Sequence, residues 1–337
     1  MAKAVVFHEL GGPEVLKIED VPVLEPKAGE VRIKVQAIGL NRSEALFRRG
    51  QYFEQPNFPS RVGVEAAGVV DAIGEDVKNI ELGDRVGVTA GQGMSEGGIC
   101  SEYAVVPAAN VLRYPENLSP TEGAAIWVQY LTGYFALVDV GNLQAGQRVL
   151  ITAASSSTGQ AAMEMARLLG AKSIATTRTA AKKRALLDAG AEEVIVTDDE
   201  NIPQRVLEIT SGKGVELIYD CVAGDTLSDL AESAARGGKI LIYGSLNNKP
   251  MLYPLMTAFT RNFTLQTYTL YTYAGAAGMG LPRNEEAYSR GVKFITEHLR
   301  TGALKPVIAK TFPLDQIQEA YRYLESNQQI GKVVVTV

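Results

Sequence analysis

The chain has 337 residues, of which 46% are apolar and 21% are charged, as in ordinary globular proteins. This composition excludes disorder for most of the length, and the 33 glycines follow no fixed period, which excludes collagen-like and other fibrous repeats. The 33 basic and 38 acidic residues give a net charge of −5, which argues against a dedicated nucleic-acid-binding surface. At about 150 residues per domain, the length indicates two domains.

Cysteine usage and the N-terminal segment predict a cytoplasmic protein. Cys100 and Cys221 are the only cysteines, and two cysteines so far apart do not form a disulfide scaffold. The opening MAKAVVFHEL contains no long apolar run, so it is not a signal peptide. No apolar run reaches the roughly 18 residues that a membrane-spanning helix needs.

The first 120 or so residues show the pattern of short strands separated by turns. Apolar and polar residues alternate in EVRIKVQAIGLN, which is the period of a half-buried strand. Further strands are predicted in AKAVVFHEL, VGVEAAGVVDAIG, DRVGVTA and SEYAVVP. Many short strands punctuated by Gly and Pro predict a barrel-like β module.

From about residue 120 the pattern changes to apolar strands that alternate with helices. Strands are predicted in QRVLITAA, SIATT, EVIVT, VELIYDCVA and KILIYGSL. Helices are predicted at 158–169, in TAAKKRALLDAG, and near 201–210 and 226–236. This alternation predicts βαβ units with right-handed crossovers, and hence an α/β fold with a doubly wound parallel sheet.

The last part of the chain returns to the first module. The tyrosine-rich stretch TLQTYTLYTYAGAAGMGLP fits neither pattern, and helices are expected over Glu285–Arg300 and 314–326. The final strand, KVVVTV, needs partners, and the β module is its expected host. The predicted domains are therefore 1–122 with 262–337, and an inserted doubly wound domain over 123–261.

A strand, a tight turn and a helix in VLITAASSSTGQAAMEMARLLGA provide the context of a dinucleotide-binding fingerprint. The usual G-x-G-x-x-G is reduced here to Ala153, Ser155 or Ser156, and Gly159. Free N–H groups at a helix N-terminus bind a pyrophosphate. Ser155, Ser156, Ser157, Thr158 and Gly159 are the predicted contacts. A polar turn with a serine N-cap is the alternative.

The end of the next strand indicates which cofactor binds. NAD sites place an acidic residue about 20 residues after the glycine motif, but SIATT is followed here by Arg178. Lys182 and Lys183 come next. A ribose 2′-phosphate favours such a cationic cluster. We therefore expect NADPH, with Arg178 and Lys182 as ligands, although a solvated basic helix start is the alternative.

Together these features resemble the medium-chain dehydrogenase/reductase superfamily, in its zinc-independent branch of quinone oxidoreductases of the zeta-crystallin type. The resemblance covers essentially the whole chain. Its landmarks are QAIGLNRSEALFRRGQY, VGVEAAGVVDAIGEDVKNIELGDRV, GGICSEYAVVP, QYLTGY, the AASSSTG turn and IGKVVV. It implies a β-rich, GroES-like catalytic domain interrupted by a Rossmann domain, with the active site in the cleft between them.

The same resemblance implies that no zinc is bound. Asn41 stands where the alcohol dehydrogenase branch has a zinc-binding cysteine, Val64 replaces the histidine of its Gly-His-Glu motif, and Val128 lies near its third ligand. Glu65 is retained, as a structural residue. The structural-zinc cysteines are absent, and His8 and His298 have no partner at a useful spacing.

Two further departures affect the predicted cofactor contacts. Ser156, Ser157 and Thr158 replace the usual Gly-Gly-Val of the turn. Thr197 stands where related sequences place a tyrosine beside the adenine, so the adenine contacts are left open.

Without zinc, the resemblance implies hydride transfer to quinones or to alkenes conjugated with a carbonyl. Asn41 and Tyr52 are the expected catalytic residues, and Asn41 is also an expected cofactor contact. A turn residue and a packed aromatic residue are the respective alternatives. The nicotinamide pocket is expected to include Thr132, Gly244 and Ser245, and the acceptor is expected to contact Tyr52, Tyr268, Tyr271 and Tyr273. For the last three tyrosines, a place in the apolar core is the alternative.

The expected assembly is a homodimer that pairs through an edge strand near 249–254. No membrane partner is expected. A different class of function, a nucleotide-binding structural or RNA-binding protein like some zeta-crystallin relatives, is the alternative that the acidic pI of about 5.4 disfavours.

Overall fold

The computed structural model describes residues 1–337, apart from the side chains of Glu96 and Ala277, and divides into two compact units. Unit 1 comprises Met1–Gln129, Leu270–Thr301 and Lys305–Val337, and unit 2 comprises Tyr130–Thr269 and Gly302–Leu304. Both ends of the chain thus form one unit and the middle forms another. The main divisions fall seven and eight residues later than 122/123 and 261/262.

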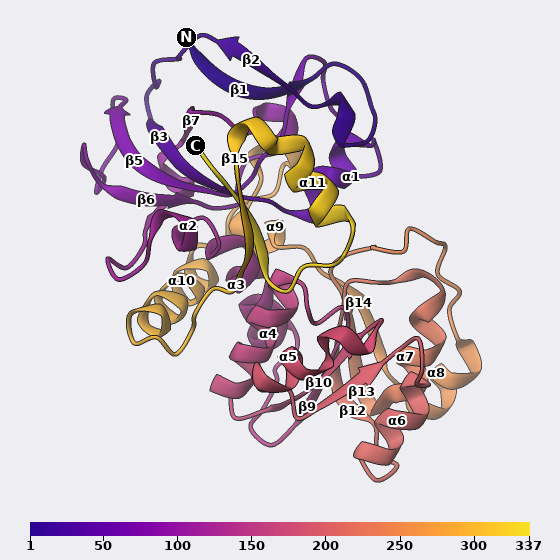
Figure 1. The fold of residues 1–337 in the computed structure, drawn as a ribbon. Helices are drawn as coiled ribbons and strands as arrows, with labels where there is room; N and C mark the ends of the chain where they lie inside the picture. Colours follow the sequence, from indigo (N-terminus) through magenta and orange to yellow (C-terminus); the bar gives the residue numbers. More distant parts are fainter. The chain divides into compact units, whose positions relative to one another are not determined.

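A seven-stranded sheet forms the centre of unit 1 (Figure 1). Its strands are β3 (Glu30–Gly39), β5 (Ala66–Ile73), β6 (Arg85–Val88), β7 (Tyr103–Pro107), β8 (Val111–Arg113), β15 (Ile308–Pro313) and β16 (Lys332–Thr336). The order is β15-β16-β3-β5-β6-β8, and β7 also pairs with β3. The C-terminal strand β16 pairs antiparallel with β3, with Val334 opposite Gly39. The predicted return of the last strand to the first module is therefore confirmed.

The remaining elements of unit 1 are short strands and helices around this sheet. A three-stranded sheet has the order β2-β1-β4. Its strands are β1 (Ala2–Phe7), β2 (Lys17–Val21) and β4 (Ser60–Arg61). The α-helices are α1 (Arg42–Arg48), α2 (Pro120–Gly123), α9 (Tyr271–Ala274), α10 (Glu285–Arg300) and α11 (Ile317–Glu325). The 3-10 turns are η1 (Pro13–Val15), η2 (Met94–Glu96), η3 (Ala108–Asn110), η7 (Ala277–Met279) and η8 (Leu314–Gln316). Helix α11 packs on β15 and β16 and closes the apolar core.

Unit 2 is a doubly wound sheet of six parallel strands in the order β11-β10-β9-β12-β13-β14. The strands are β9 (Arg148–Ile151), β10 (Lys172–Thr177), β11 (Glu193–Val196), β12 (Val215–Asp220), β13 (Ala234–Ile242) and β14 (Thr264–Thr267). Their inner residues are almost continuously buried, as expected for a sheet covered on both faces. The predicted fold class is therefore confirmed.

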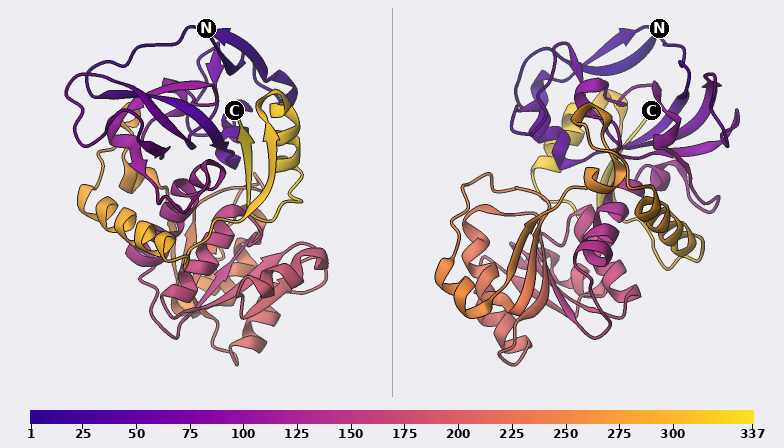
Figure 2. Two further views of the ribbon diagram at one scale, coloured as in Figure 1. Left: turned by 60° about the vertical axis from the view of Figure 1, so that its left-hand side comes forward. Right: turned by 180° about the vertical axis from the view of Figure 1, so that it is seen from behind.

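Helices lie on both faces of this sheet (Figure 2). They are α4 (Ser157–Leu168), η5 (Ala180–Lys182), α5 (Lys183–Asp188), α6 (Ile202–Ile209), η6 (Gly224–Thr226), α7 (Leu227–Ser233) and α8 (Leu255–Arg261). Helix α3 (Trp127–Tyr134) carries the chain from unit 1 into unit 2 and continues as the π-helical segment η4 (Phe135–Val140). Helices α6 and α7 pack together, and α7 packs on α8.

Two sequence predictions for unit 2 are wrong. The helix expected at 226–236 ends at Ser233, because β13 begins at Ala234 and pairs there with β12. Residues 249–254, expected as an edge strand, form no strand and lead into α8, while β14 occupies the sheet edge. Pro250 and Pro254 lack the N–H that a paired strand donates, which accounts for this error. Among the helices described here, none combines the length and apolarity needed to cross a bilayer.

Candidate functional site

The loops after four neighbouring strands meet at the carboxyl edge of the sheet in unit 2. The turn with Ala153 follows β9, Arg178 follows β10, the Asp220 loop follows β12, and Gly244 follows β13. The chain winds outward from β9 in one direction and from β12 in the other. In such folds ligands bind in the crevice at this reversal of strand order. The parallel topology therefore brings most of the predicted cofactor residues to one edge.

The turn after β9 keeps the geometry of a glycine-rich loop although it has lost most of its glycines. Ala153 has a φ of 44°, a conformation that glycine adopts more easily. Gly159 is required, because a Cβ there would lie 2.6 Å from Cα of Ala154. The first turn of α4 follows at once, with the Ser156 hydroxyl accepting the N–H of Gly159 at 3.1 Å. The turn thus keeps the close helix–strand approach of a pyrophosphate site.

Hydroxyl groups link this turn to the end of β13. Thr158 Oγ1 lies 3.2 Å from Ser156 Oγ and 3.0 Å from the Tyr243 hydroxyl. The Tyr243 ring stacks on Tyr219 at 3.9 Å with an interplanar angle of 13°. Sequence reasoning missed Tyr243, and its place directly before Gly244 was the only signal. Thr158, where valine is usual, therefore ties the turn after β9 to the loop after β13.

A buried carboxylate fixes the loop after β12. Asp220 accepts the Thr152 hydroxyl at 2.6 Å and the backbone N–H groups of Val222 and Ala223 at 3.0 and 2.9 Å. Burial raises the pKa of Asp220, and these three donors oppose that effect. Ala223 has a φ of 56°, so this loop also contains a strained alanine. Sequence analysis did not single out Asp220.

The predicted cationic pair lies beside the turn. Arg178 is exposed at the end of β10, and Lys182 Nζ lies 3.0 Å from the Ser155 hydroxyl oxygen. Burial lowers the pKa of Lys182, and the positive charge of Arg178 lowers it further, so the two cations are close. Lys183 instead forms an ion pair with Glu200 at 3.6 Å. The structure therefore shows that Lys182 and Lys183 have different partners, which the sequence alone did not indicate.

The other residues predicted to contact the nicotinamide or the acceptor in unit 2 differ in exposure. Thr132 is buried within α3, whereas Ser245 is exposed after β13. Tyr268 is buried, and its N–H donates to the Ile242 carbonyl at 2.8 Å. Thr197 N–H donates to the Thr177 carbonyl at 2.8 Å, next to Arg178.

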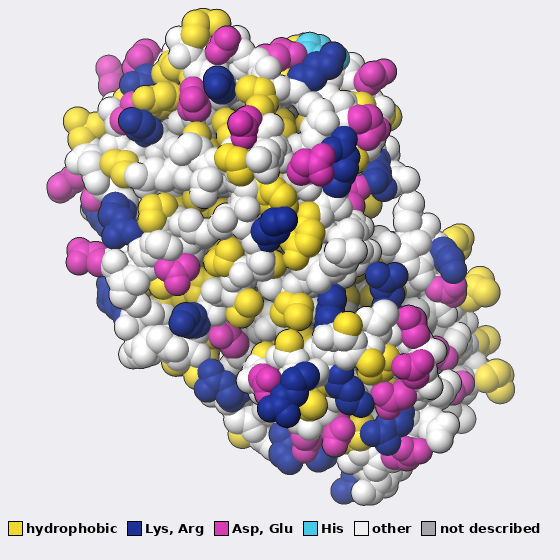
Figure 3. Space-filling view, viewed as in Figure 1, with side chains coloured by type: hydrophobic (Ala, Val, Ile, Leu, Met, Phe, Trp, Pro, Cys, Tyr) yellow, Lys and Arg dark blue, Asp and Glu magenta, His cyan; other side chains and the backbone are white. Residues whose placement is uncertain are grey.

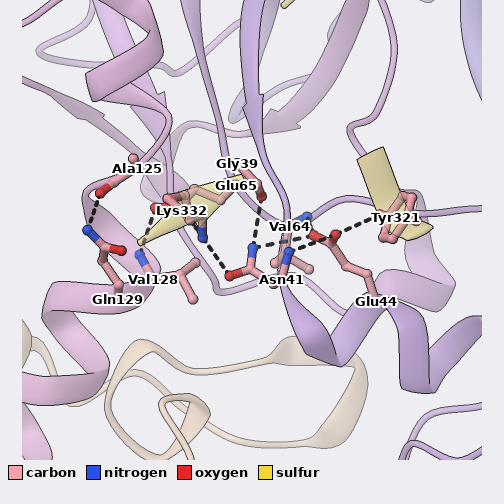
Figure 4. A network of polar contacts seen from close by, with 10 residues as sticks. All are labelled: Gly39, Asn41, Glu44, Val64, Glu65, Ala125, Val128, Gln129, Tyr321 and Lys332. Atoms are coloured by element: carbon pink, nitrogen blue, oxygen red, sulfur yellow. Dashed lines mark hydrogen bonds and ion pairs between the residues drawn. The ribbon is translucent and has the colours of Figure 1, made fainter. Parts of the chain in front are cut away.

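In unit 1, Asn41 is part of a buried polar network (Figure 4). Lys332 Nζ donates to Asn41 Oδ1 at 2.7 Å and to Glu65 Oε2 at 2.6 Å. The other oxygen of Glu65 accepts the Val128 N–H at 2.9 Å. The side chains of Lys332 and Glu65 are 1% and 0% exposed. The retained Glu65 thus forms a buried ion pair, and sequence reasoning missed its partner.

The amide nitrogen of Asn41 has partners of its own. It donates to the Gly39 carbonyl at 2.9 Å and, over a longer 3.4 Å, to Glu44 Oε1. Glu44 also accepts the N–H groups of Asn41 and Val64 at 3.0 and 3.1 Å and the Tyr321 hydroxyl at 2.7 Å. Burial raises the pKa of Glu44, although these donors stabilise its charged form. The side-chain oxygen, the side-chain nitrogen and the backbone N–H of Asn41 therefore all have hydrogen-bond partners.

Within the part of the chain that the structure describes, the side chains around these residues offer no metal-binding cluster. Among the side chains that the structure describes, no three from His, Cys, Asp and Glu are grouped so that they could hold a metal ion. Val64 and Val128 join the network through their backbone N–H groups.

Tyr52 belongs to an aromatic cluster in unit 1. Its ring lies 3.9 Å from that of Phe53, which meets the ring of Tyr271 edge-on at 6.1 Å. Burial raises the pKa of Tyr52 strongly, and Tyr271 and the Glu54 carboxylate raise it further. A hydrogen bond between Tyr52 and Tyr271 raises this pKa too. Tyr271 is buried in this packing, and Tyr273 is half-buried.

Comparison with known proteins covers both units. Residues 27–116 match the family model of the alcohol dehydrogenase GroES-like domain, and residues 189–335 match that of a zinc-binding dehydrogenase. The sequence is 31% identical to the quinone oxidoreductase of Lama guanicoe, over 99% of this chain and 97% of that protein.

Two solved structures show the same similarity. A structure titled as an NAD-dependent alcohol dehydrogenase has a TM-score of 0.89 and 31% identity, over 99% of both chains. The quinone oxidoreductase of Escherichia coli complexed with NADPH has a TM-score of 0.90 and 28% identity, over 99% of this chain and 100% of the other.

Proposed function

The chain belongs to the quinone oxidoreductase family of the medium-chain dehydrogenases/reductases, and we propose that it reduces a quinone or an α,β-unsaturated carbonyl compound with NADPH and without a metal ion. The observation that carries this proposal is the carboxyl edge of the sheet in unit 2. There a pyrophosphate-type turn and two cations lie together, and no acidic residue follows β10 directly.

Unit 2 is the proposed site for NADPH, which supplies hydride from its nicotinamide ring when bound. The N-terminus of α4 offers N–H groups to the pyrophosphate, together with the hydroxyls of Ser155, Ser156, Ser157 and Thr158. Lys182 and Arg178 hold the 2′-phosphate. Thr132, Gly244 and Ser245 are proposed to line the nicotinamide pocket. One similar structure is titled NAD-dependent and another contains NADPH, and the two cations after β10 favour NADPH here.

The acceptor class follows from the residues around Asn41. A catalytic zinc needs thiolate, imidazole or carboxylate ligands, and the three positions of the zinc branch hold Asn41, Val64 and Val128 here. These side chains do not supply such a set. Quinones and enones delocalise the negative charge that hydride transfer produces, so they depend less on a Lewis acid.

Tyr52 is the proposed hydrogen-bond donor to the acceptor oxygen. Its raised pKa keeps the hydroxyl protonated and makes it a weak acid, so it stabilises the developing charge without giving up its proton. Solvent then supplies the proton. Tyr268, Tyr271 and Tyr273 are proposed to flank a flat acceptor, although Tyr268 and Tyr271 are mostly buried in their own units.

The test is NADPH oxidation measured with a panel of quinones, enones and aldehydes, with and without a chelator. We expect turnover with quinones and enones that the chelator does not change. Loss of activity on chelation, or turnover confined to simple aldehydes, would contradict the proposal. Tight NADPH binding without turnover of any acceptor would favour the alternative of a nucleotide-binding structural or RNA-binding protein.

We also propose that the protein is a cytoplasmic homodimer. The outer edge of β14 has no strand partner among the described residues, and an exposed apolar surface lies nearby in sequence. On this surface Leu252, Met256 and Phe259 are 80%, 73% and 70% exposed. Yellow side chains project along the right-hand edge of Figure 3, where Figure 1 places α8. Exposed apolar groups of this kind are typical of interaction sites.

The assembly prediction is checked by light scattering at micromolar concentration. The natural chain should have twice the 36.2 kDa mass of one chain, and the double variant Leu252→Glu/Met256→Glu should be monomeric. Lys213→Glu, on the surface at a distance in sequence, is the control for added negative charge. A monomeric natural chain would refute the proposal.

A further inference from the structure

We propose that Lys332 is a positioning residue, whose ammonium group orients the Asn41 side chain as a hydrogen-bond donor to the acceptor. This inference rests on the proposed function, because the inference gives Asn41 a role in the proposed reaction. Lys332 lies 267 residues from Glu65 and 291 from Asn41 in sequence, yet it contacts both. Figure 4 shows its nitrogen in the network beside Asn41.

The Lys332 side chain has little freedom to adopt another arrangement. It starts on β16, and the facing strand β3 has Gly39 opposite Val334. A Cβ on Gly39 would lie 2.8 Å from Cε of Lys332 and 1.9 Å from the Ala124 carbonyl oxygen. The glycine therefore leaves room for the lysine stem to pass along the strand. At its end, the ammonium is buried and held by Glu65.

Donor and acceptor chemistry fixes which way round the Asn41 amide lies. An ammonium only donates and a carbonyl oxygen only accepts. Lys332 therefore requires the amide oxygen on its side, and the Gly39 carbonyl requires the amide NH2 on the other. Without Lys332, the orientation would rest on the bonds of the amide nitrogen alone, to Gly39 at 2.9 Å and to Glu44 at 3.4 Å. The cation on Oδ1 also polarises the amide and strengthens its N–H groups as donors.

One Asn41 hydrogen remains weakly engaged. The first Nδ2 hydrogen bonds to Gly39 at 2.9 Å, and the second reaches Glu44 only at 3.4 Å. The second hydrogen is therefore the one that a ligand oxygen takes most easily. Lys332 thus acts through Asn41 and does not itself touch the ligand.

Removing both the Lys332 and the Glu65 charge distinguishes a positioning role of Lys332 from a merely structural one. Lys332→Met alone leaves Glu65 as an uncompensated buried carboxylate and should strongly destabilise the protein. The double variant Lys332→Met/Glu65→Gln removes the whole pair and should recover most of the melting temperature. If Lys332 orients Asn41, kcat for an enone should stay about tenfold lower in the double variant, while NADPH affinity changes less than about twofold.

A mutant cycle then tests whether the effect passes through Asn41. Adding Asn41→Ala to the double variant should lower kcat little further, although Asn41→Ala alone lowers it in the natural chain. The inference is overturned if the double variant keeps the natural kcat. It is also overturned if Asn41→Ala lowers kcat by the same factor in the double variant as in the natural chain. Arg148→Met/Glu192→Gln is the control, because it removes another charge pair, joined at 2.8 Å, that belongs to unit 2 and lies outside the Asn41 network.

A second readout does not depend on turnover. The protein is labelled selectively with 15N-asparagine, and the Asn41 side-chain amide signal is assigned as the one missing from Asn41→Ala. The amide hydrogens of Asn41 should exchange slowly with solvent in the natural chain. They should lose this protection in the Lys332→Met/Glu65→Gln variant. Unchanged protection would refute the inference by itself. If the natural chain reduces no acceptor, the proposed function fails, and the amide exchange still decides whether Lys332 orients Asn41.

Discussion

Replacing Arg178 with alanine should raise the Michaelis constant for NADPH by about ten- to a hundredfold and leave that for NADH within about twofold. Hydrogen bonds to charged groups contribute about 1.5–3 kcal/mol, and each 1.4 kcal/mol is about tenfold in affinity. The NADH constant should not change, because NADH has no 2′-phosphate. Arg178 is exposed, so salt should weaken the preference for NADPH.

Lys183→Ala is the matched control for this prediction. It removes one positive charge from the same segment, but Lys183 is already engaged with Glu200. Its effect on the NADPH constant should be small, whereas Lys182→Ala should resemble Arg178→Ala, because Lys182 reaches the turn at Ser155. Equal use of NADPH and NADH by the natural chain would refute the cofactor assignment.

The fold follows from local sequence patterns where those patterns are strong. The predicted helix over Glu285–Arg300 agrees with α10 at both ends, because Asn284 caps it and a clear apolar face runs along it. The parallel strands of unit 2 are predicted well by their continuous apolar runs. Helix α8 was missed, since its apolar side chains are exposed and show no buried face.

The site was predictable only where its residues are close in sequence. The turn from Ala153 to Gly159 and the cations after β10 form local patterns, so they were found. Lys332 and Tyr243 were not, because their partners are brought to them by the pairing of β16 with β3 and by the parallel sheet. A lone lysine near the end of a strand carries no sequence signal of a buried ion pair.

Tyr52→Phe should slow quinone reduction by about tenfold or less, equivalent to ~1.4 kcal/mol, and should slow enone reduction more. A quinone spreads the arriving charge over its ring, whereas an enone collects it on one oxygen. Loss of one oriented donor to an oxyanion costs roughly 10²–10³ in rate in the strongest cases. Turnover of both substrate classes is the measurement, with Tyr323→Phe as the control for removing the hydroxyl of a half-buried tyrosine elsewhere in unit 1.

The pH dependence tests the same role from another side. Burial, Tyr271 and Glu54 all raise the pKa of Tyr52 above its ordinary value of 10. The neutral hydroxyl should therefore persist as the pH rises through 10. The enone kcat of the natural chain should not fall in that range through ionisation of Tyr52, so Tyr52→Phe should leave the shape of the pH profile there unchanged. A hydroxyl with so high a pKa is also a poor proton donor to an enolate, so it orients and stabilises without transferring its proton. If a folded, NADPH-binding Tyr52→Phe variant lost all quinone turnover, Tyr52 would instead be an essential acid.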